Sequence, residues 1–363
     1  MKLFFIVFLI IIIATLSYVS WHVWHVLPLP RWQRWTVVGI LIAAFCTAFL
    51  NLGVTDRLPM SLATWCYETG WSMFIVMLYL CIIFLVLDLG RLCHLVPREW
   101  LHDNPWTSGA IAVLLTGVLI YGNLNYKHKE RVELTYTTGK PLDRDYKIVM
   151  LSDLHLGYHN RRAELDRWVE MINAEQPDHV LIAGDIIDMS IRPLIEDHMA
   201  DGLRDIQAPV TACLGNHEYF SSHPKALRFF KEAGIQLLRD SAMQVGPFTF
   251  IGRDDRMYRH RKDLRLLTEG IDSATYTILL DHQPYHLEEA EQCGIDLQLS
   301  GHTHEGQVWP ISWITHALYE CAYGEWQRGS THYYISSGMG IWGGKFRIGT
   351  QSEYVVINIK RSR

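Results

Sequence analysis

Four long apolar segments without a charged residue occupy the first third of the chain. They are Leu3–Val19, Trp35–Val54, Trp71–Leu87 and Trp106–Tyr121. An α-helix rises about 1.5 Å per residue, so about 17 to 20 residues can cross a hydrocarbon core of about 30 Å. Each segment is long enough to span a bilayer. The segments predict a membrane domain of four transmembrane helices over residues 1–124.

The tryptophans of this part support a membrane location. Eight of the 13 tryptophans lie here, and each stands at or beyond the end of an apolar segment. They are Trp21, Trp24, Trp32, Trp35, Trp65, Trp71, Trp100 and Trp106. Tryptophan is enriched where a transmembrane helix meets the headgroups. We interpret these residues as aromatic belts, which makes the lipid bilayer a partner of the chain.

The first apolar segment has an alternative interpretation. Lys2 followed by an apolar stretch is a minimal signal peptide, but Ser20–Trp24 offers no small-residue cleavage site, so we expect the segment to be retained. The other three segments could be buried helices of a soluble domain. Their lack of an amphipathic face and of intervening charge argues against this.

The distribution of basic residues predicts the orientation in the membrane. Both ends of a four-helix domain lie on one side, which carries six basic residues against four on the other. The six are Lys2, Arg57, Lys127, Lys129, Arg131 and Lys140, and the four are Arg31, Arg34, Arg91 and Arg98. Because cytoplasmic loops are enriched in lysine and arginine, we expect a multi-pass protein of the cell membrane with a cytoplasmic second half.

The rest of the chain has the composition of a soluble domain. Only 11 of the 71 charged residues fall within residues 1–124, which leaves 60 for the other 239. We expect a linker over residues 125–144 and a soluble domain over residues 145–363. The net charge of −5 gives no basic excess, which argues against nucleic acid as a partner. The seven scattered cysteines indicate buried thiols rather than a disulfide framework.

Short β-rich runs in the second half each end in polar residues. The runs are Lys147–Leu151, His179–Ala183, Pro209–Leu214, Tyr276–Leu280 and Asp296–Ser300, and a helical pattern covers Arg161–Asn173. Strands with functional residues at their carboxyl ends are typical of α/β sheets. We therefore expect an α/β fold in which five polar strand ends meet at one edge.

The residues expected at this edge have the chemistry of metal ligands. They are Asp153, His155, Asp185, Asn216, His282, His302 and His304. Oxygen and imidazole ligands suit divalent ions of the manganese, iron or zinc kind, and seven ligands are too many for one tetrahedral site. Asp185, alone after a glycine, is the best placed to bridge two ions. Each motif alone could be an ordinary turn or a surface histidine, but their joint order argues against that.

The motif order is D-x-H, GD-x-x-D, GNHE, a late histidine and G-H-x-H, and it resembles the calcineurin-like metallophosphoesterase superfamily over Asp145–Lys360. The resemblance implies a four-layer α/β/β/α sandwich and two divalent metal ions, with manganese favoured over iron, zinc or magnesium. It implies that Asp153, His155 and His304 hold one ion, that Asn216, His282 and His302 hold the other, and that Asp185 bridges them. It also implies that His217 acts catalytically on the substrate and that Asp188 orients His217.

Two late segments are similar to one branch of this superfamily. DLQLSGHTH (296–304) and YYISSGMGIWGGKFRIG (333–349) resemble bacterial membrane-associated phosphodiesterases, some of which cleave the pyrophosphate of UDP-diacylglucosamine. One position departs from the pattern, because Glu305 stands where the family usually has a glycine. This departure puts the close backbone approach of that loop in doubt.

Two further segments allow more than one interpretation. Arg253–Arg265 carries six basic and three acidic residues, and could seat a second phosphate, meet anionic lipid headgroups or form the solvated start of a helix. The aromatic residues after His304 could line an acyl-chain groove, enter the membrane interface or pack locally. These aromatics are Trp309, Trp313, Tyr319, Tyr323 and Trp326.

The sequence therefore predicts a two-metal phosphoesterase, most simply a phosphodiesterase or pyrophosphatase for a lipid-linked or membrane-proximal phosphate. Two ions about 3.5 to 4 Å apart neutralise phosphate charge and activate a water for in-line attack. A membrane-tethered phosphomonoesterase or protein phosphatase has the same site chemistry. A third possibility is a catalytically silent metal-binding sensor, against which the complete ligand set argues.

Overall fold

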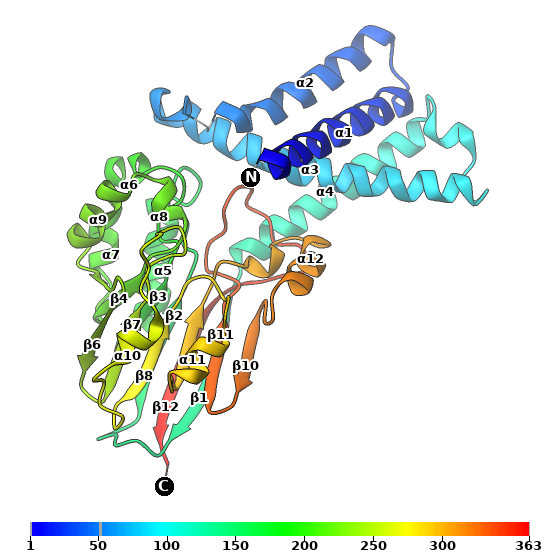
Figure 1. Ribbon diagram of the computed structural model, residues 1–363. Helices are drawn as coiled ribbons and strands as arrows, with labels where there is room; N and C mark the ends of the chain where they lie inside the picture. The colour runs from blue at the N-terminus through cyan, green and yellow to red at the C-terminus, as the bar shows by residue number, and fades with distance from the viewer. Residues whose placement is uncertain (1, 51–52, 363) are drawn as a thin grey trace. The chain divides into compact units, whose positions relative to one another are not determined.

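A computed structural model describes residues 2–50 and 53–362 of the chain. The chain forms two compact units, each described here by itself (Figure 1). One extends to Leu124 and includes residues 343–345, and the other begins at Asn125 and contains the rest of the chain.

The first unit is helical. It contains α1 (Lys2–Val26), α2 (Arg31–Leu50), α3 (Met60–Leu92) and all but the last three residues of α4 (Pro105–Lys127), with the short 3₁₀ helices η1 (Thr55–Arg57) and η2 (Arg98–Leu101) in the connections. Within the described residues, these four α-helices are long and apolar enough to cross a membrane, as predicted. Helices α1, α3 and α4 are longer than their apolar segments, because they continue into the polar residues at their ends, whereas α2 begins four residues before its segment and ends at Leu50.

Helices α1, α2 and α3 pack through small side chains and one polar cluster. A Cβ atom on Gly70 would lie 2.2 Å from the backbone nitrogen of Ala48, so α2 and α3 approach backbone to backbone. Asp88 of α3 accepts a hydrogen bond from the Tyr18 hydroxyl at 2.8 Å and lies 3.0 Å from Nε2 of His22, both on α1. These contacts fix α1 against α3.

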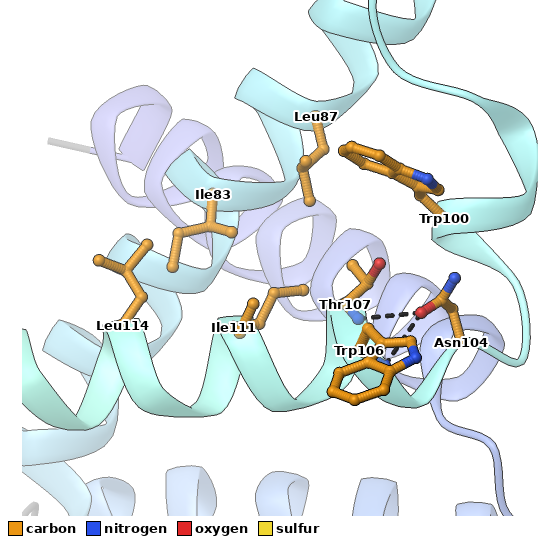
Figure 2. Close-up of a pocket in the computed structure, with 9 residues that line it drawn as sticks. Ile83, Leu87, Trp100, Asn104, Trp106, Thr107, Ile111 and Leu114 are labelled. Carbon is orange, nitrogen blue, oxygen red and sulfur yellow. Dashed lines mark hydrogen bonds between the residues drawn. The ribbon is translucent and has the colours of Figure 1, made fainter.

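Helix α4 begins with an asparagine cap beside an apolar hollow (Figure 2). The side-chain oxygen of Asn104 accepts hydrogen bonds from the backbone N–H groups of Trp106 and Thr107, each at 3.0 Å, which satisfies two donors of the first turn. The hollow has a volume of about 520 Å³, and α3, η2 and α4 contribute its lining. Such an apolar surface is expected on helices that face lipid.

The second unit contains two six-stranded sheets. The first sheet has the order β1-β12-β2-β3-β4-β5 and the second has the order β10-β11-β9-β8-β7-β6. The strands of the first are β1 (Lys129–Thr138), β2 (Tyr146–Leu151), β3 (His179–Ala183), β4 (Val210–Cys213), β5 (Gln236–Leu237) and β12 (Ser352–Arg361). Those of the second are β6 (Ser241–Val245), β7 (Phe248–Gly252), β8 (Tyr276–Leu280), β9 (Leu297–Ser300), β10 (Gly324–Arg328) and β11 (Thr331–Ile335).

Helices cover both outer faces. On the first sheet lie α5 (Arg162–Ala174), α6 (Arg192–Glu196), α7 (Met199–Arg204) and α9 (His223–Glu232), whereas α10 (Leu264–Thr268) and α11 (Glu288–Gln292) lie on the second. Short elements α8 (His217–Phe220), η3 (His304–Gly306) and α12 (Ile311–Leu318) follow strand ends. The predicted strands and helix α5 agree with the structure to within two residues at each end.

The core follows from the alternation of side chains along each strand. Ile148 and Met150 of β2 face the space between the sheets, where they join Phe250 of β7 and Ile278 of β8. Val149 and Leu151 point the other way and pack with Trp168 of α5 and its neighbours. Successive residues of a strand point to opposite faces, so a fully apolar strand is buried on both. The result is the predicted four-layer α/β/β/α sandwich.

Residues 125–144 are not the linker that we expected. Lys129–Thr138 form β1, an edge strand that pairs in parallel with β12 from Lys129 opposite Ser352 to Thr138 opposite Arg361. Leu134 and Tyr136 are buried in the core between the sheets. Helix α4 ends at Lys127 and β1 begins at Lys129, so one residue, His128, connects them.

The cysteines only partly follow the expectation. All seven are free thiols, of which Cys66, Cys213 and Cys321 are buried, Cys81 and Cys293 are half-buried, and Cys46 and Cys93 are exposed. Both belong to the apolar helical unit, Cys46 within α2 and Cys93 just after the end of α3.

Candidate metal centre

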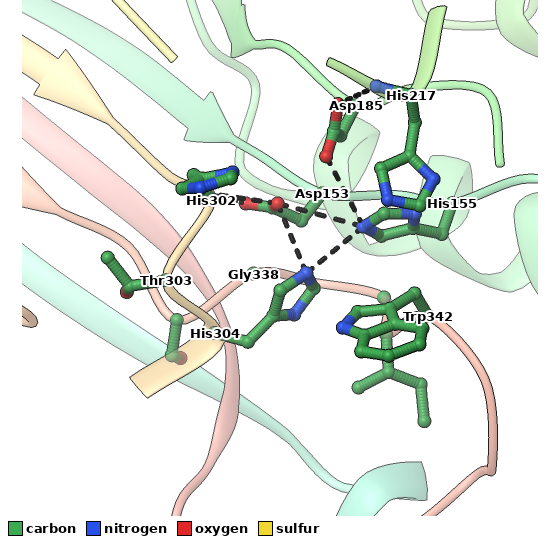
Figure 3. A network of polar contacts seen from close by, with 12 residues as sticks. Asp153, His155, Asp185, His217, His302, Thr303, His304, Gly338 and Trp342 are labelled. Carbon is green, nitrogen blue, oxygen red and sulfur yellow. Dashed lines mark hydrogen bonds and ion pairs between the residues drawn. The ribbon is translucent and has the colours of Figure 1, made fainter. Parts of the chain in front are cut away.

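The structure brings the predicted residues together at the carboxyl ends of five strands. Asp153 and His155 follow β2, Asp185 and Asp188 follow β3, and Asn216 and His217 follow β4. His282 follows β8, and His302 and His304 follow β9. Because these strands run in parallel within each sheet, their ends meet at one edge. Sequence positions 150 residues apart thereby become neighbours (Figure 3).

One group consists of Asp153, His155 and His304. Their ligand atoms lie within 4.8 Å of one another, and all three side chains are buried. Nε2 of His304 is 3.2 Å from Oδ1 of Asp153 and 3.0 Å from Nε2 of His155. Two imidazole nitrogens and a carboxylate oxygen that converge in this way form a donor set suited to a divalent cation.

A second group consists of Asp185, His282 and His302, again with ligand atoms within 4.8 Å of one another. Nε2 of His282 lies 3.1 Å from Oδ2 of Asp185, while Nδ1 of His282 lies 2.7 Å from the backbone oxygen of Ala183. Contact between one ring nitrogen and a carbonyl leaves the other nitrogen free to act as a ligand.

Asn216 and Asp185 complete the arrangement. The side-chain oxygen of Asn216 is buried and has no hydrogen-bond partner, which is costly unless a cation occupies the space in front of it. Asp185 also belongs to a third group of possible ligands, together with His155 and His217. It therefore lies between the two groups, where a bridging carboxylate is required. The residues present fit a pair of divalent ions.

The backbone of the predicted ligands is strained. Asp153, His155, Asp185, His302 and His304 all have positive φ values, between 44° and 70°. This region is rarely populated by residues other than glycine, and each instance costs of the order of 1 to 3 kcal/mol. Such strain persists only where the surroundings enforce it, and it concentrates at functional sites.

Two glycines allow the carboxylates to approach. A Cβ atom on Gly215 would lie 2.1 Å from Oδ1 of Asp185, and one on Gly301 would lie 2.2 Å from Oδ2 of Asp153. No side chain fits at either position. Gly215 opens the GNHE motif and Gly301 opens the G-H-x-H motif. Each glycine therefore makes room for the carboxylate of a neighbouring strand end.

Charge coupling sets the protonation of the site. Burial would raise the pKa of Asp153 and of Asp185, but the facing histidines hold both below the usual range. Burial lowers the pKa of His302 to about 3 and that of His304 to about 4, so these rings are neutral. Burial opposes the charge of His155, but hydrogen bonds with Asp153 and Asp188 raise its pKa to about 10.

Asp188 contacts the two histidines that flank the site. Its Oδ1 lies 3.2 Å from Nδ1 of His155 and 3.3 Å from Nδ1 of His217. The backbone N–H of His217 donates to Asp185 at 2.9 Å, which places the ring over the centre. His217 is partly exposed, whereas Asp188 is buried. Their placement suits a proton-transferring histidine and a carboxylate that orients it.

Glu218 is a site residue to which the sequence analysis gave no role. Its buried carboxylate accepts hydrogen bonds from the backbone N–H groups of Gly215 at 2.7 Å, Ile187 at 3.0 Å and Asp185 at 3.3 Å. Glu218 thereby joins the loop after β3 to the loop after β4. Burial, followed by the charge of Asp185, raises its pKa to about 7. The glutamate that ends the GNHE motif is the sequence signal from which the role of Glu218 could have been predicted.

Arg347 is a second residue that the sequence analysis missed. It is fully buried, and its guanidinium donates to the backbone oxygens of His304 at 2.7 Å, Gly340 at 3.1 Å and Ser337. These bonds fix the loop that carries His304 to the loop after β11. A lone arginine in KFRIG gives no sequence signal for such a role.

The loop around Glu305 accommodates the departure from the family pattern. Glu305 has a φ of 52°, which explains why a glycine is usual there. Its half-buried carboxylate lies 3.8 Å from Nε2 of His316 of α12. The close backbone approach occurs one residue later, where a Cβ atom on Gly306 would lie 2.5 Å from the backbone nitrogen of Ser312. The loop is therefore intact despite Glu305.

Comparison with known proteins decides the family. The calcineurin-like phosphoesterase family model matches residues 146–306. A metallophosphoesterase of Aquifex aeolicus is 32% identical over 251 residues, which cover 65% of this chain and 95% of the relative. One of Campylobacter jejuni is 31% identical over 257 residues, 68% of each chain. The chain belongs to the calcineurin-like phosphoesterase family. It is a metal-dependent phosphoester hydrolase, and the family implies a dinuclear centre of divalent ions.

The membrane helices also have a parallel among relatives. A zebrafish (Danio rerio) transmembrane protein with a metallophosphoesterase domain is 28% identical over 317 residues, 80% of this chain and 72% of the relative. Residues 125–363 make up only about two thirds of the chain, so this match extends into the helical unit. Together with the four apolar helices, it indicates that this calcineurin-like phosphoesterase is a membrane protein.

Proposed function

We propose that this phosphoesterase hydrolyses a phosphodiester or pyrophosphate bond in a lipid-linked or membrane-proximal substrate. The observation that carries the proposal is the connection between α4 and β1, which consists of His128 alone. A chain spans at most about 3.6 Å per residue, so the metal centre cannot move far from the end of a membrane-spanning helix. Confinement raises the local concentration of lipid substrates and does nothing comparable for soluble ones.

The exposed side chains of helix α12 support the proposal that the substrate has an apolar part. The helix begins seven residues after His304, and its side chains Trp313, Ile314 and Leu318 are 66%, 54% and 71% exposed. Large apolar side chains that gather on a short helix mark a surface for another apolar body. An acyl chain attached to the scissile phosphate fits that surface. The resemblance to membrane-associated phosphodiesterases acting on a diacylated sugar nucleotide agrees with this.

The residues of the centre have separate tasks in the proposed reaction. Asp153, His155 and His304 would hold one ion, Asn216, His282 and His302 the other, with Asp185 between. When bound, the ions supply the activated water and the charge that offsets the phosphate. His217, oriented by Asp188, would donate a proton to the leaving oxygen. Manganese is the proposed metal, and a cytoplasmic site at the cell membrane is the proposed location.

The decisive experiment compares substrates with the purified full-length protein. A lipid-linked pyrophosphate in mixed micelles, a soluble diester and a soluble monoester are assayed with Mn²⁺ and after chelation. We expect Mn²⁺-dependent turnover of the lipid-linked substrate and the diester in excess of the monoester. Preferential turnover of the monoester, or of a phosphoprotein, would support the phosphatase alternative, and no turnover with metal bound would support the silent sensor.

A further inference from the structure

A basic hollow lies beside the metal centre, at the carboxyl ends of β7 and β8. Its volume is about 440 Å³, and it is formed by the loop before α10 and the segment before α11. The lining residues are Arg253, Arg256, Tyr258, Arg261, Lys262, Asp263, Tyr285, His286 and Glu289. The sequence left three interpretations of Arg253–Arg265 open. Residues 256–260 form exposed turns that lead to the N-cap of α10 at Asp263, as the interpretation of a solvated helix start expects, whereas Arg253 is buried.

The hollow contains donors without acceptors. Nε of Arg253 and both Nε and Nη1 of Arg261 are buried and have no hydrogen-bond partner. The Arg253 side chain is only 9% exposed and that of Arg261 only 12%. Leaving a buried charged donor unsatisfied costs more than a neutral one, so such groups normally face a ligand, an ion or water. Both arginines also line the hollow, so an anion seated in it would lie beside these donors.

Acidic residues orient the arginines without cancelling the charge of the hollow. Nη1 of Arg253 lies 2.6 Å from Glu289 and 3.3 Å from Asp281, and Arg261 also pairs with Asp281. Among the residues that line the hollow, four are basic and two are acidic, and Asp281 lies behind two of the arginines. Arg256 makes no ion pair with any carboxylate that the structure describes, and it is exposed.

Two tyrosines lie between the hollow and the metal centre. The Tyr319 ring lies 6.3 Å from the ring of His302, and the Tyr285 ring lies 4.9 Å from that of Tyr319. The guanidinium of Arg256 stands over the Tyr285 ring at 4.8 Å from its centroid. Asp281, which pairs with Arg253 and Arg261, directly precedes His282. Two aromatic rings therefore separate the hollow from the centre.

We propose that this hollow binds a second phosphate group, distinct from the one that is hydrolysed. Guanidinium groups bind phosphate through charge-assisted hydrogen bonds, and Nε and Nη1 of Arg261, on different edges of its guanidinium, both have no hydrogen-bond partner. The phosphate belongs either to the substrate itself or to the headgroup of a neighbouring anionic lipid. The assignment to the substrate rests on the proposed function, but the binding of phosphate does not.

The first experiment measures binding. The full-length protein in detergent is treated with a chelator, which removes metal as a phosphate ligand, and is titrated with inorganic pyrophosphate by calorimetry. Arg256→Gln should weaken binding roughly 10-fold, the usual size of a charge-assisted hydrogen bond. Arg259→Gln is the matched control, because Arg259 is an exposed residue of the same loop that does not line the hollow. Equal affinities for the two variants would overturn the proposal.

The second experiment identifies the source of the phosphate. Two metal-loaded assays use nitrophenyl diesters that differ only in a remote phosphate group. If the second phosphate belongs to the substrate, Arg256→Gln should raise KM roughly 10-fold for the phosphate-bearing diester and leave its kcat nearly unchanged. Both KM and kcat for the plain diester should change little. If a lipid headgroup occupies the hollow, the variant should instead weaken activity on both diesters, and only when anionic lipid is present.

Kinetics identical to those of Arg259→Gln under all conditions would overturn both versions. That result would leave the lipid-linked scissile substrate untouched, because the substrate comparison above tests it separately.

Discussion

At the scale of single residues, Asp185 gives the most direct test of the two-metal site. It lies within ligand distance of residues from both groups, 3.7 Å from Nε2 of His155 and 3.1 Å from Nε2 of His282. Asp185→Asn removes the charge that offsets the repulsion between two ions. We expect bound manganese to fall and phosphoesterase turnover to fall by several decades. Elemental analysis and a diester assay measure both, with Asp201→Asn, an exposed carboxylate, as the control. Unchanged metal content and turnover would contradict a two-metal site.

His217 tests the division between ligands and catalytic groups. His217→Ala should leave metal content near that of the wild type and lower turnover about 10²- to 10⁴-fold, the usual contribution of general acid catalysis. The loss should be smaller for a nitrophenol leaving group, which needs little protonation. Because the ring also lies within ligand distance of Asp185 and His155, loss of metal would instead make His217 a ligand.

The nine predicted site residues come together because each follows a strand that the sequence shows clearly. An apolar run such as HVLIA followed by Gly184 and Asp185 predicts both the strand and the location of its polar end. Glu218 and Arg347 could not be predicted in the same way. Their partners are backbone groups of loops that meet only in the folded chain, so no local pattern records them.

At the scale of elements, β1 is the principal error of the sequence analysis. KERVELTYTT was assigned to the linker between the two halves, and its partner β12 lies more than 200 residues further along the chain. The alternation of Val132, Leu134 and Tyr136 on one face was a signal for a half-buried strand. Edge strands expose one side to water, so charge alone does not exclude them.

The position of β1 predicts which fragments fold. A fragment of residues 125–363 keeps β1, and a fragment of residues 145–363 loses it together with the buried Leu134 and Tyr136. Burial of such side chains contributes about 1.5 to 3 kcal/mol each. We expect the shorter fragment to melt roughly 10 °C lower, as measured by circular dichroism, and to aggregate through the exposed edge of β12. Equal melting temperatures would show that β1 is dispensable.

At the scale of the whole molecule, the orientation in the membrane decides where the substrate is sought. Six basic residues against four predict a cytoplasmic phosphoesterase domain. A reporter fused to the end of the full chain leaves β1 intact and should give a cytoplasmic signal, whereas a fusion after Arg98, between α3 and α4, should give the opposite one. The reverse pair of signals would place the metal centre outside the cytoplasm.

The membrane helices provide the last test, because a metal centre attached to α4 through His128 encounters lipid-linked phosphates far more often than a free domain does. The fragment of residues 125–363 keeps every residue of the centre, so any change in its chemistry on soluble substrates should be small. We expect it to match the full-length protein on a soluble diester and to lose most of its activity on a lipid-linked pyrophosphate in vesicles. The rates of both proteins on both substrates, at equal metal content, measure this. An equal loss on both substrates would mean that the helices stabilise the fold of the phosphoesterase domain rather than give it access to lipid-linked substrates. The attachment of the domain to the membrane would then no longer support a lipid-linked substrate.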